Sequence, residues 1–352
     1  MRNPVLQVRN LEVSFRVDTG WLFRHDYHSI RAVDGVSFDV YPAETLGIVG
    51  ESGCGKSTLA RALLGLQRPK RGEILWLGED LAQASEETLR RKRREIQLIF
   101  QDPQGSLDPR MTVGAIIAEP LKTFFPSMSR LQIRERVTGI LKMVGLRPDQ
   151  INRYPHEFSG GQCQRVGIAR ALVVNPRLVV CDEPVSALDV SIQAQIVNLL
   201  KDLQKKLQLS LIFIAHDLSI VRHVSDRILV MYMGKVMEMA DRSSIYRQPR
   251  HPYTRALIES VPIPDPVRER ARARRSIQGD MPSPMNPPSG CVFRTRCPFA
   301  TELCAEKVPE LEMLDNGHQV ACHHHRDLPQ PPEPGEEAEV ETRAEGGEQP
   351  QS

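Results

Sequence analysis

The sequence predicts an α/β fold in which crossover helices connect the strands of a parallel sheet. Two apolar segments, LVVCD (178–182) and LIFIAH (211–216), are typical of buried strands. The segment between them is predicted to be a helix, because its apolar residues recur at helical spacing on one face. These residues are Ile192, Ile196, Leu199, Leu203 and Leu207. Strands that alternate with helices in this way favour a parallel sheet.

A glycine-rich loop lies between another strand and helix nearer the N-terminus. GESGCGKST (50–58) follows the apolar run TLGIV, precedes the helix candidate LARALLGL and fits G-x-x-x-x-G-K-[ST]. The glycines let backbone N–H groups point at phosphate oxygens, Lys56 offsets phosphate charge, and the Ser57 hydroxyl can ligate Mg²⁺. The loop residues predicted to bind nucleotide are Gly50, Ser52, Gly53, Gly55, Lys56, Ser57 and Thr58. The motif therefore predicts a P-loop that binds nucleotide phosphates and Mg²⁺.

Two acidic residues end the predicted strand in LVVCDEP (178–184). Asp182 is placed to hold Mg²⁺, directly or through water, and Glu183 to orient or deprotonate the attacking water. A solvated strand end is the alternative for this segment taken alone, but the phosphate loop upstream favours a catalytic role.

The chain divides into regions of different character. We expect a nucleotide-handling domain over 5–250, with strands and one helix in residues 1–100 and a helical subdomain at about 105–170. The apolar residues that predict this subdomain are Ile133, Val137, Ile140, Leu141 and Val144. A loop-rich extension over 251–326 follows, and the acidic, Pro/Gly-rich tail over 327–352 is expected to be disordered.

Composition excludes some classes of protein. Lys and Arg number 46 and Asp and Glu 44, so the net charge argues against a dedicated nucleic-acid binder. The basic run RRKRR (90–94) is interpreted as a solvated helix face and RERARARRS (268–276) as a basic linker. No apolar run approaches the roughly 18 residues of a membrane span, and no signal-peptide core is present, so we expect a cytoplasmic chain.

Four further motifs accompany the loop and the acids. With IFQDP (99–103), FSGGQ (158–162), SALD (186–189) and IAHD (214–217), the chain resembles the ATP-binding cassette family over about residues 5 to 260. The resemblance implies a P-loop NTPase cassette with an inserted helical subdomain. It also implies that Gln101 links the Mg²⁺ site to a membrane partner and that His216 senses the γ-phosphate. The loop residues implied to contact ATP held by the opposite subunit are Ser159, Gly160, Gly161 and Gln162.

The family also stacks an aromatic ring on adenine. Tyr27 lies 29 residues before Lys56 (56 − 27), as this role would require, although Trp21 and Phe23 are close by. Phe158 stands where the family usually has leucine, and we expect no loss of function from another apolar side chain.

Longer stretches narrow the resemblance to one branch. YPHEFSGGQCQRVGIARAL, CDEPVSALDVSIQAQIVNLL, HPYTRAL and MNPPSGCVFRTRCP closely resemble the oligopeptide/dipeptide importer ATPases. The resemblance implies an ATPase on the cytoplasmic face of the inner membrane, a paralogous ATPase partner in a heterodimer, two integral membrane permease subunits and, indirectly, an extracytoplasmic peptide-binding protein. An importer of nickel or glutathione-like peptides and a non-transport cassette ATPase are the alternatives. The single phosphate loop and the lack of sustained heptads count against the latter.

Four of the seven cysteines gather near the C-terminus. Cys291, Cys297, Cys304 and Cys322 are separated by five, six and seventeen residues, which predicts metal binding in a reducing compartment but does not identify the metal. Resemblance to the importer branch implies a [4Fe–4S] cluster with a structural or oxidant-sensing role. Zn²⁺ and four free thiols are the alternatives, and a histidine from 323–325 could replace Cys322 as a ligand.

Overall fold

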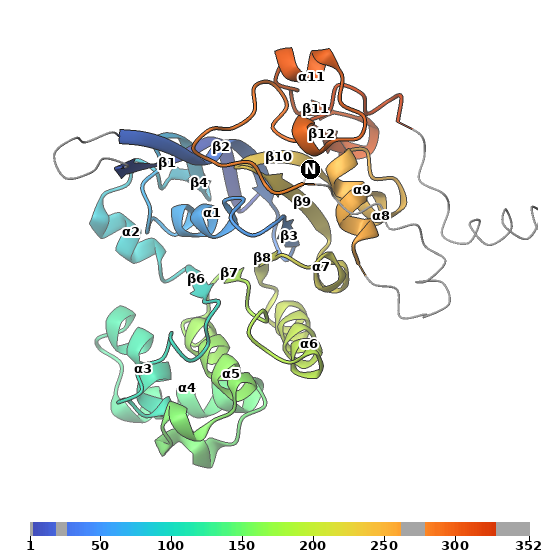
Figure 1. Ribbon diagram of the computed structural model, residues 1–352. Helices are drawn as coiled ribbons and strands as arrows, with labels where there is room; N and C mark the ends of the chain where they lie inside the picture. Colours follow the sequence, from blue (N-terminus) through green and yellow to red (C-terminus); the bar gives the residue numbers. More distant parts are fainter. Residues whose placement is uncertain (1–2, 19–26, 262–278, 329–352) are drawn as a thin grey trace, which may run out of the picture.

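The computed structural model describes residues 3–18, 27–261 and 279–328, shown as coloured ribbon in Figure 1. The predicted linker at 268–276, the tail from 329 onward, Trp21 and Phe23 lie outside the described residues, as does the side chain of Tyr27.

An eight-stranded sheet forms the centre of the described chain, in the order β11-β12-β10-β9-β3-β8-β7-β6. The five strands from β9 to β6 are parallel, as predicted. Their bounds are β3 (Thr45–Val49), β6 (Ile96–Ile99), β7 (Leu178–Asp182), β8 (Ser210–Ala215) and β9 (Arg227–Tyr232). Every residue of β3, β7 and β8 is buried, which explains why these segments are continuous apolar runs in the sequence. The other strands are antiparallel: β10 (Lys235–Asp241), β12 (Gln319–Val320) and β11 (Glu312–Met313).

A second, antiparallel sheet has the order β2-β1-β4-β5, and β3 of the central sheet lies between its β2 and β4 along the chain. Its strands are β1 (Leu6–Asp18), β2 (Tyr27–Val40), β4 (Arg71–Trp76) and β5 (Glu79–Asp80). The prediction of one helix within residues 1–100 is wrong, because α1 (Lys56–Leu63) is joined by α2 (Glu86–Lys92). Ser85 caps α2 by accepting a hydrogen bond from the Thr88 N–H, a short local signal that the prediction overlooked.

The predicted helical region forms a separate lobe beside the sheet (Figure 1). Its elements are α3 (Val113–Phe124), α4 (Arg130–Met143), α5 (Gly160–Leu172) and 3₁₀ turns at Pro148–Asn152 and Pro155–Glu157. The apolar positions used to predict α4 pack inward: Val137, Ile140 and Leu141 are buried against α3 and α5. The basic run 90–94 is only partly a solvated face, since the Arg94 guanidinium lies 4.4 Å from the ring centroid of Phe125.

The remaining helices flank the central sheet. They are α6 (Val190–Leu207), α7 (Leu218–Val224), α8 (Arg242–Arg247), α9 (Pro252–Glu259) and α11 (Glu302–Glu306), with 3₁₀ turns at Arg294–Arg296 and Asp315–Gly317. The predicted apolar face of α6 is buried at Ile196 and Leu203, and it extends to Val197 and Leu200. None of the helices within 3–18, 27–261 and 279–328 is both long and apolar enough to span a membrane.

The C-terminal extension is built onto the same sheet as the preceding residues. Strand β12 pairs with β10, so chain on both sides of the predicted boundary at 250 contributes to one sheet. Phe293 is 1% exposed and packs its ring against Tyr232 of β9 and Tyr253 of α9. The extension therefore shares the core of the cassette instead of folding around a core of its own.

Candidate nucleotide site and cysteine pocket

The phosphate loop turns from the end of β3 into α1. Gly55 immediately precedes α1 with φ 107°, a conformation that favours glycine. A Cβ at this position would lie 1.9 Å from the carbonyl oxygen of Ala32, so a side chain cannot be accommodated there. The loop thus has the tight backbone curvature that phosphate binding requires.

Lys56 is held at the centre of this loop. Its side chain is only 3% exposed, and Nζ donates to the carbonyl oxygens of Gly50 at 2.8 Å and Glu51 at 3.0 Å. The same Nζ lies 3.9 Å from Oε1 of Glu183. A buried ammonium at this point supplies the positive charge that a bound triphosphate needs.

Asp182 lies at the end of β7, directly opposite the start of α1. The Ser57 hydroxyl donates to Asp182 Oδ1 at 2.9 Å. Burial raises the pKa of Asp182, and the neighbouring charge of Glu183 raises it further, although the Ser57 hydrogen bond acts in the opposite direction. A hydroxyl and a carboxylate in need of a compensating cation fit Mg²⁺, which prefers oxygen ligands.

Glu183 and two predicted partners form a polar cluster one residue further on. Gln101 Nε2 donates to Glu183 Oε2 at 2.9 Å, and His216 Nδ1 lies 3.6 Å from the same oxygen. Glu183 has φ +46°, which is uncommon for a residue other than glycine and is characteristic of functional sites. A cavity of about 540 Å³ opens here, lined by Ser52, Gln101, Asp102, Glu183, Ser186, Ala187 and His216. Asp102 and Ser186 were not among the predicted site residues, although they lie within quoted motifs.

The FSGGQ loop does not line this cavity. Ser159 is exposed at the start of α5, where its Oγ accepts from the Gln162 N–H and Gln162 Oε1 accepts from the Ser159 N–H. A Cβ on Gly161 would lie 2.5 Å from Cγ2 of Ile192, so glycine allows α5 and α6 to pack closely. Ser159 thus lies on the outside of this chain, while the N–H groups of Ser159 and Gln162 are used within the helix cap. Phe158 is buried beneath it, 7% exposed, which agrees with its apolar role.

The four C-terminal cysteines line one narrow cavity. Cys291, Cys297, Cys304 and Cys322 are free thiols and share this cavity with His323 and His324. Burial raises the pKa of Cys297 to about 11 and that of Cys322 to about 12, and the charges of neighbouring cysteines add to both shifts. The cavity holds about 10 Å³, about the space of one water molecule. Across the described part of the chain, no three His, Cys, Asp or Glu side chains converge on a metal position. The donor set suits a thiophilic metal, but the side chains are not arranged around one.

Three residues that the sequence did not single out link the phosphate loop to the C-terminal extension: Glu51 in the loop, and Tyr253 and Arg296 outside it. The Glu51 N–H donates to the Tyr253 hydroxyl oxygen at 2.9 Å, and Arg296 Nη1 lies 2.9 Å from Glu51 Oε2 and 3.1 Å from Oε1. Tyr253 belongs to the motif HPYTRAL, which served only as a family marker. Arg296 lies in MNPPSGCVFRTRCP, which also served only as a family marker, and nothing local predicts its contact with Glu51, 245 positions away.

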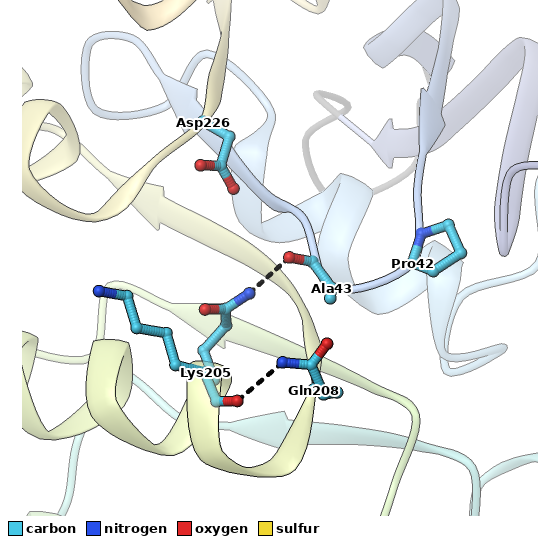
Figure 2. Close-up of a pocket in the computed structure, with 6 residues that line it drawn as sticks. Pro42, Ala43, Lys205, Gln208 and Asp226 are labelled. Carbon is cyan, nitrogen blue, oxygen red and sulfur yellow. Dashed lines mark hydrogen bonds between the residues drawn. The ribbon is translucent and has the colours of Figure 1, made fainter. Parts of the chain in front are cut away.

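A second large depression, of about 500 Å³, lies at the opposite ends of the strands (Figure 2). Gln204 Nε2 donates to the Ala43 carbonyl oxygen, and Gln208 Nε2 donates to the Lys205 carbonyl oxygen. The first bond ties the end of α6 to the turn before β3, and the second is local to the end of α6, so the polar lining has a structural role.

The fold and this site define an ATP-binding cassette ATPase, and the chain belongs to the ABC transporter family. Residues 33–186 match the ABC transporter family, and residues 237–304 match the C-terminal region of oligopeptide/dipeptide transporters. The chain is 57% identical to the oligopeptide transport ATP-binding protein OppF of Haemophilus influenzae over 319 residues, which is 90% of this chain and 96% of that protein. It is 55% identical to OppF of Escherichia coli over 323 residues, 91% and 96% of the two chains.

Solved structures agree with this assignment. A dimeric ATP-binding cassette in a post-hydrolysis state with ADP and Pi is 29% identical and superposes with a TM-score of 0.60, over 67% of this chain and 98% of that one. The resemblance to the ATP-binding cassette family and the predicted fold class are thereby confirmed.

Proposed function

We propose that this chain is the ATP-hydrolysing subunit that energises the import of oligopeptides and dipeptides across the cytoplasmic membrane. The observation that carries the proposal is the 57% identity to an oligopeptide transport ATP-binding protein, over an alignment that covers 90% of the chain. Residues 237–304, matched to the oligopeptide/dipeptide transporter region, support peptide as the substrate class.

We assign the site residues the following roles, which their positions support. Lys56 and the N–H groups of its loop bind the phosphates, and Ser57 and Asp182 hold Mg²⁺. Glu183 activates the attacking water, His216 contacts the γ-phosphate, and Gln101 connects Glu183 to the surface that receives the membrane partner. The adenine ring is assigned to Tyr27 on the spacing argument alone.

A second ATPase chain is proposed to complete each site. Ser159 is exposed and lies outside the cavity lined by Glu183 and His216, so its loop is free to serve the site of an opposing cassette. We assign this role to a paralogous ATPase, with two integral membrane permease subunits at the cytoplasmic face of the membrane and a peptide-binding protein on the far side.

Co-purification tests this assembly. A tagged chain isolated from detergent-solubilised membranes is expected to bring along two integral membrane proteins and a paralogous ATPase, and cells that carry Lys56→Ala should assemble the complex but not take up labelled peptide. Isolation without integral membrane partners would overturn the import function, and an active transporter containing two copies of this chain alone would overturn the heterodimer.

We further propose that Cys291, Cys297, Cys304 and Cys322 hold a [4Fe–4S] cluster that helps to fold the extension. Four reduced thiols in one cavity support this proposal. The cluster would cross-link the segments that carry the four cysteines. The cavity between these cysteines would have to widen to accept it.

Metal analysis distinguishes the candidates. Anaerobically purified protein is expected to be coloured and to contain iron and sulfide, and Cys322→Ser should lose most of the iron. Cys163→Ser is the control, because Cys163 is also a free thiol but lies near Pro155, away from the cavity. A colourless protein with about one zinc per chain would identify a zinc site, and one without metal would identify free thiols.

A further inference from the structure

Glu51 connects the C-terminal extension to the catalytic lysine. Its carboxylate accepts two hydrogen bonds from Arg296, and its backbone N–H donates to the Tyr253 hydroxyl. Its carbonyl oxygen accepts from Lys56 Nζ at 3.0 Å and from the Cys54 N–H at 3.3 Å. Glu51 is therefore bound by the extension through its carboxylate and N–H group, and it binds Lys56 through its carbonyl oxygen.

The residues that hold Glu51 are themselves fixed by packing. Tyr232, Tyr253 and Phe293 are each at most 1% exposed, with ring centroids 4.8 to 5.3 Å apart. The Arg296 guanidinium lies 5.8 Å from the Tyr232 ring centroid and donates to the Tyr232 hydroxyl at 3.3 Å. The Arg296 side chain is 8% exposed and the Glu51 side chain 26%, so their ion pair is partly shielded from solvent. A pair with both partners preorganised in this way is expected to be stronger than a surface pair.

The charge of Glu51 makes this contact more than a structural link. Glu51 is an acidic side chain in a loop whose task is to bind a polyanion. Without Arg296, its carboxylate would be a negative charge beside the position of the phosphates and would oppose their binding. Arg296 both neutralises this charge and fixes the residue whose carbonyl orients Lys56.

We propose that Arg296 is a positioning residue for the phosphate loop: through Glu51 it keeps the loop in the shape and charge state that bind MgATP. The folded cysteine segment, which carries Arg296 between Cys291 and Cys297, is then required for full ATP affinity. This inference rests on the proposed nucleotide site at Lys56.

A double-mutant cycle tests the proposal on the full-length chain. Titration with a fluorescent ATP analogue should show about tenfold weaker binding for Arg296→Gln, the equivalent of one charge-assisted hydrogen bond. The double variant Glu51→Gln/Arg296→Gln should regain affinity to within about threefold of wild type, because the unpaired carboxylate is gone. Arg296→Lys, which keeps the charge, should bind nearly as tightly as wild type.

Controls separate positioning from general damage. Arg326→Gln is the matched control, because it breaks an arginine–carboxylate pair with Glu312 within the same extension, away from the loop. Arg296→Gln, Arg296→Lys, Arg326→Gln and the double variant should each unfold in one cooperative transition above the assay temperature and keep the metal content of wild type, so that a change in ATP affinity does not come from unfolding. Tyr253→Phe, which removes only the hydroxyl that accepts from the Glu51 N–H, should also weaken ATP binding.

The outcomes are distinct. Wild-type affinity in Arg296→Gln would overturn the inference, as would a double variant as weak as the single one. Unchanged affinity in Lys56→Ala would instead overturn the proposed nucleotide site. Loss of affinity in Lys56→Ala but not in Arg296→Gln would reject the inference alone.

Discussion

Glu183→Gln is expected to lower ATP turnover by about two to four orders of magnitude while leaving ATP binding intact, because it removes a positioned general base. The amide keeps the size of the side chain and can still accept from Gln101, so the cavity should retain its shape. It cannot take a proton from water, and it no longer balances the charge of Lys56, whose Nζ lies 3.9 Å away. Loss of catalysis without loss of binding is therefore the expected signature.

The measurement is steady-state phosphate release together with analogue titration. The bound form should accumulate as an ATP-loaded dimer when the partner ATPase is present. Glu79→Gln is a suitable control, since Glu79 on β5 pairs with Lys92, away from the cavity, and the variant should turn over ATP like wild type. If Glu183→Gln turned over ATP within about tenfold of the wild-type rate, Glu183 would not be the general base.

The nucleotide site could be predicted from sequence because its determinants are local. A buried strand, a glycine-rich turn and a helix follow one another within residues 45–63, and the acids end their own strand. Parallel strands bring their carboxyl ends to one edge, so the topology alone brings Lys56 and His216 close to Glu183. Helix α4 could be predicted for the same reason, because the spacing of its apolar residues is a local signal.

Contacts between distant segments could not be predicted in this way. Strand β1 pairs with β2 and β4 through packing between strands that are far apart in the sequence. The apolar pattern of residues 1–100 predicted strands there, but it did not show that they form a separate antiparallel sheet. Arg296 and Glu51 meet only because β12 joins β10 and brings the extension over the end of β3. The cysteine spacing indicated metal chemistry but contained no information about where the side chains point.

The largest effect on stability is expected from Glu238→Ala. Glu238 lies on β10 and is 0% exposed. Its carboxylate accepts hydrogen bonds from the N–H groups of Arg250 at 2.6 Å and His251 at 3.0 Å, and Oε1 lies 2.7 Å from Nε2 of His318. One side chain thus joins the turn before α9 to the chain that enters β12.

Alanine would leave these buried groups without a partner, and the extension should become about 3 kcal/mol easier to open. Hydrogen exchange is the direct measurement, because it reports local opening. Peptides covering 250–257 and 312–320 should exchange about a hundredfold faster, while β7 and β8 should stay protected. Glu238→Gln, which retains one acceptor, should have an intermediate effect.

Glu312→Ala is the matched control for this prediction. Glu312 also ties the extension together, through His325 and Arg326, but its side chain is 45% exposed and its interactions are screened by solvent. Its removal should change exchange little. If Glu238→Ala exchanged like wild type in both peptides, the carboxylate would not be what fastens the extension to the sheet. If Glu238→Ala opens the extension as expected, ATP affinity should also fall. Tyr253 and Arg296 contact Glu51 only while the extension is packed against the sheet.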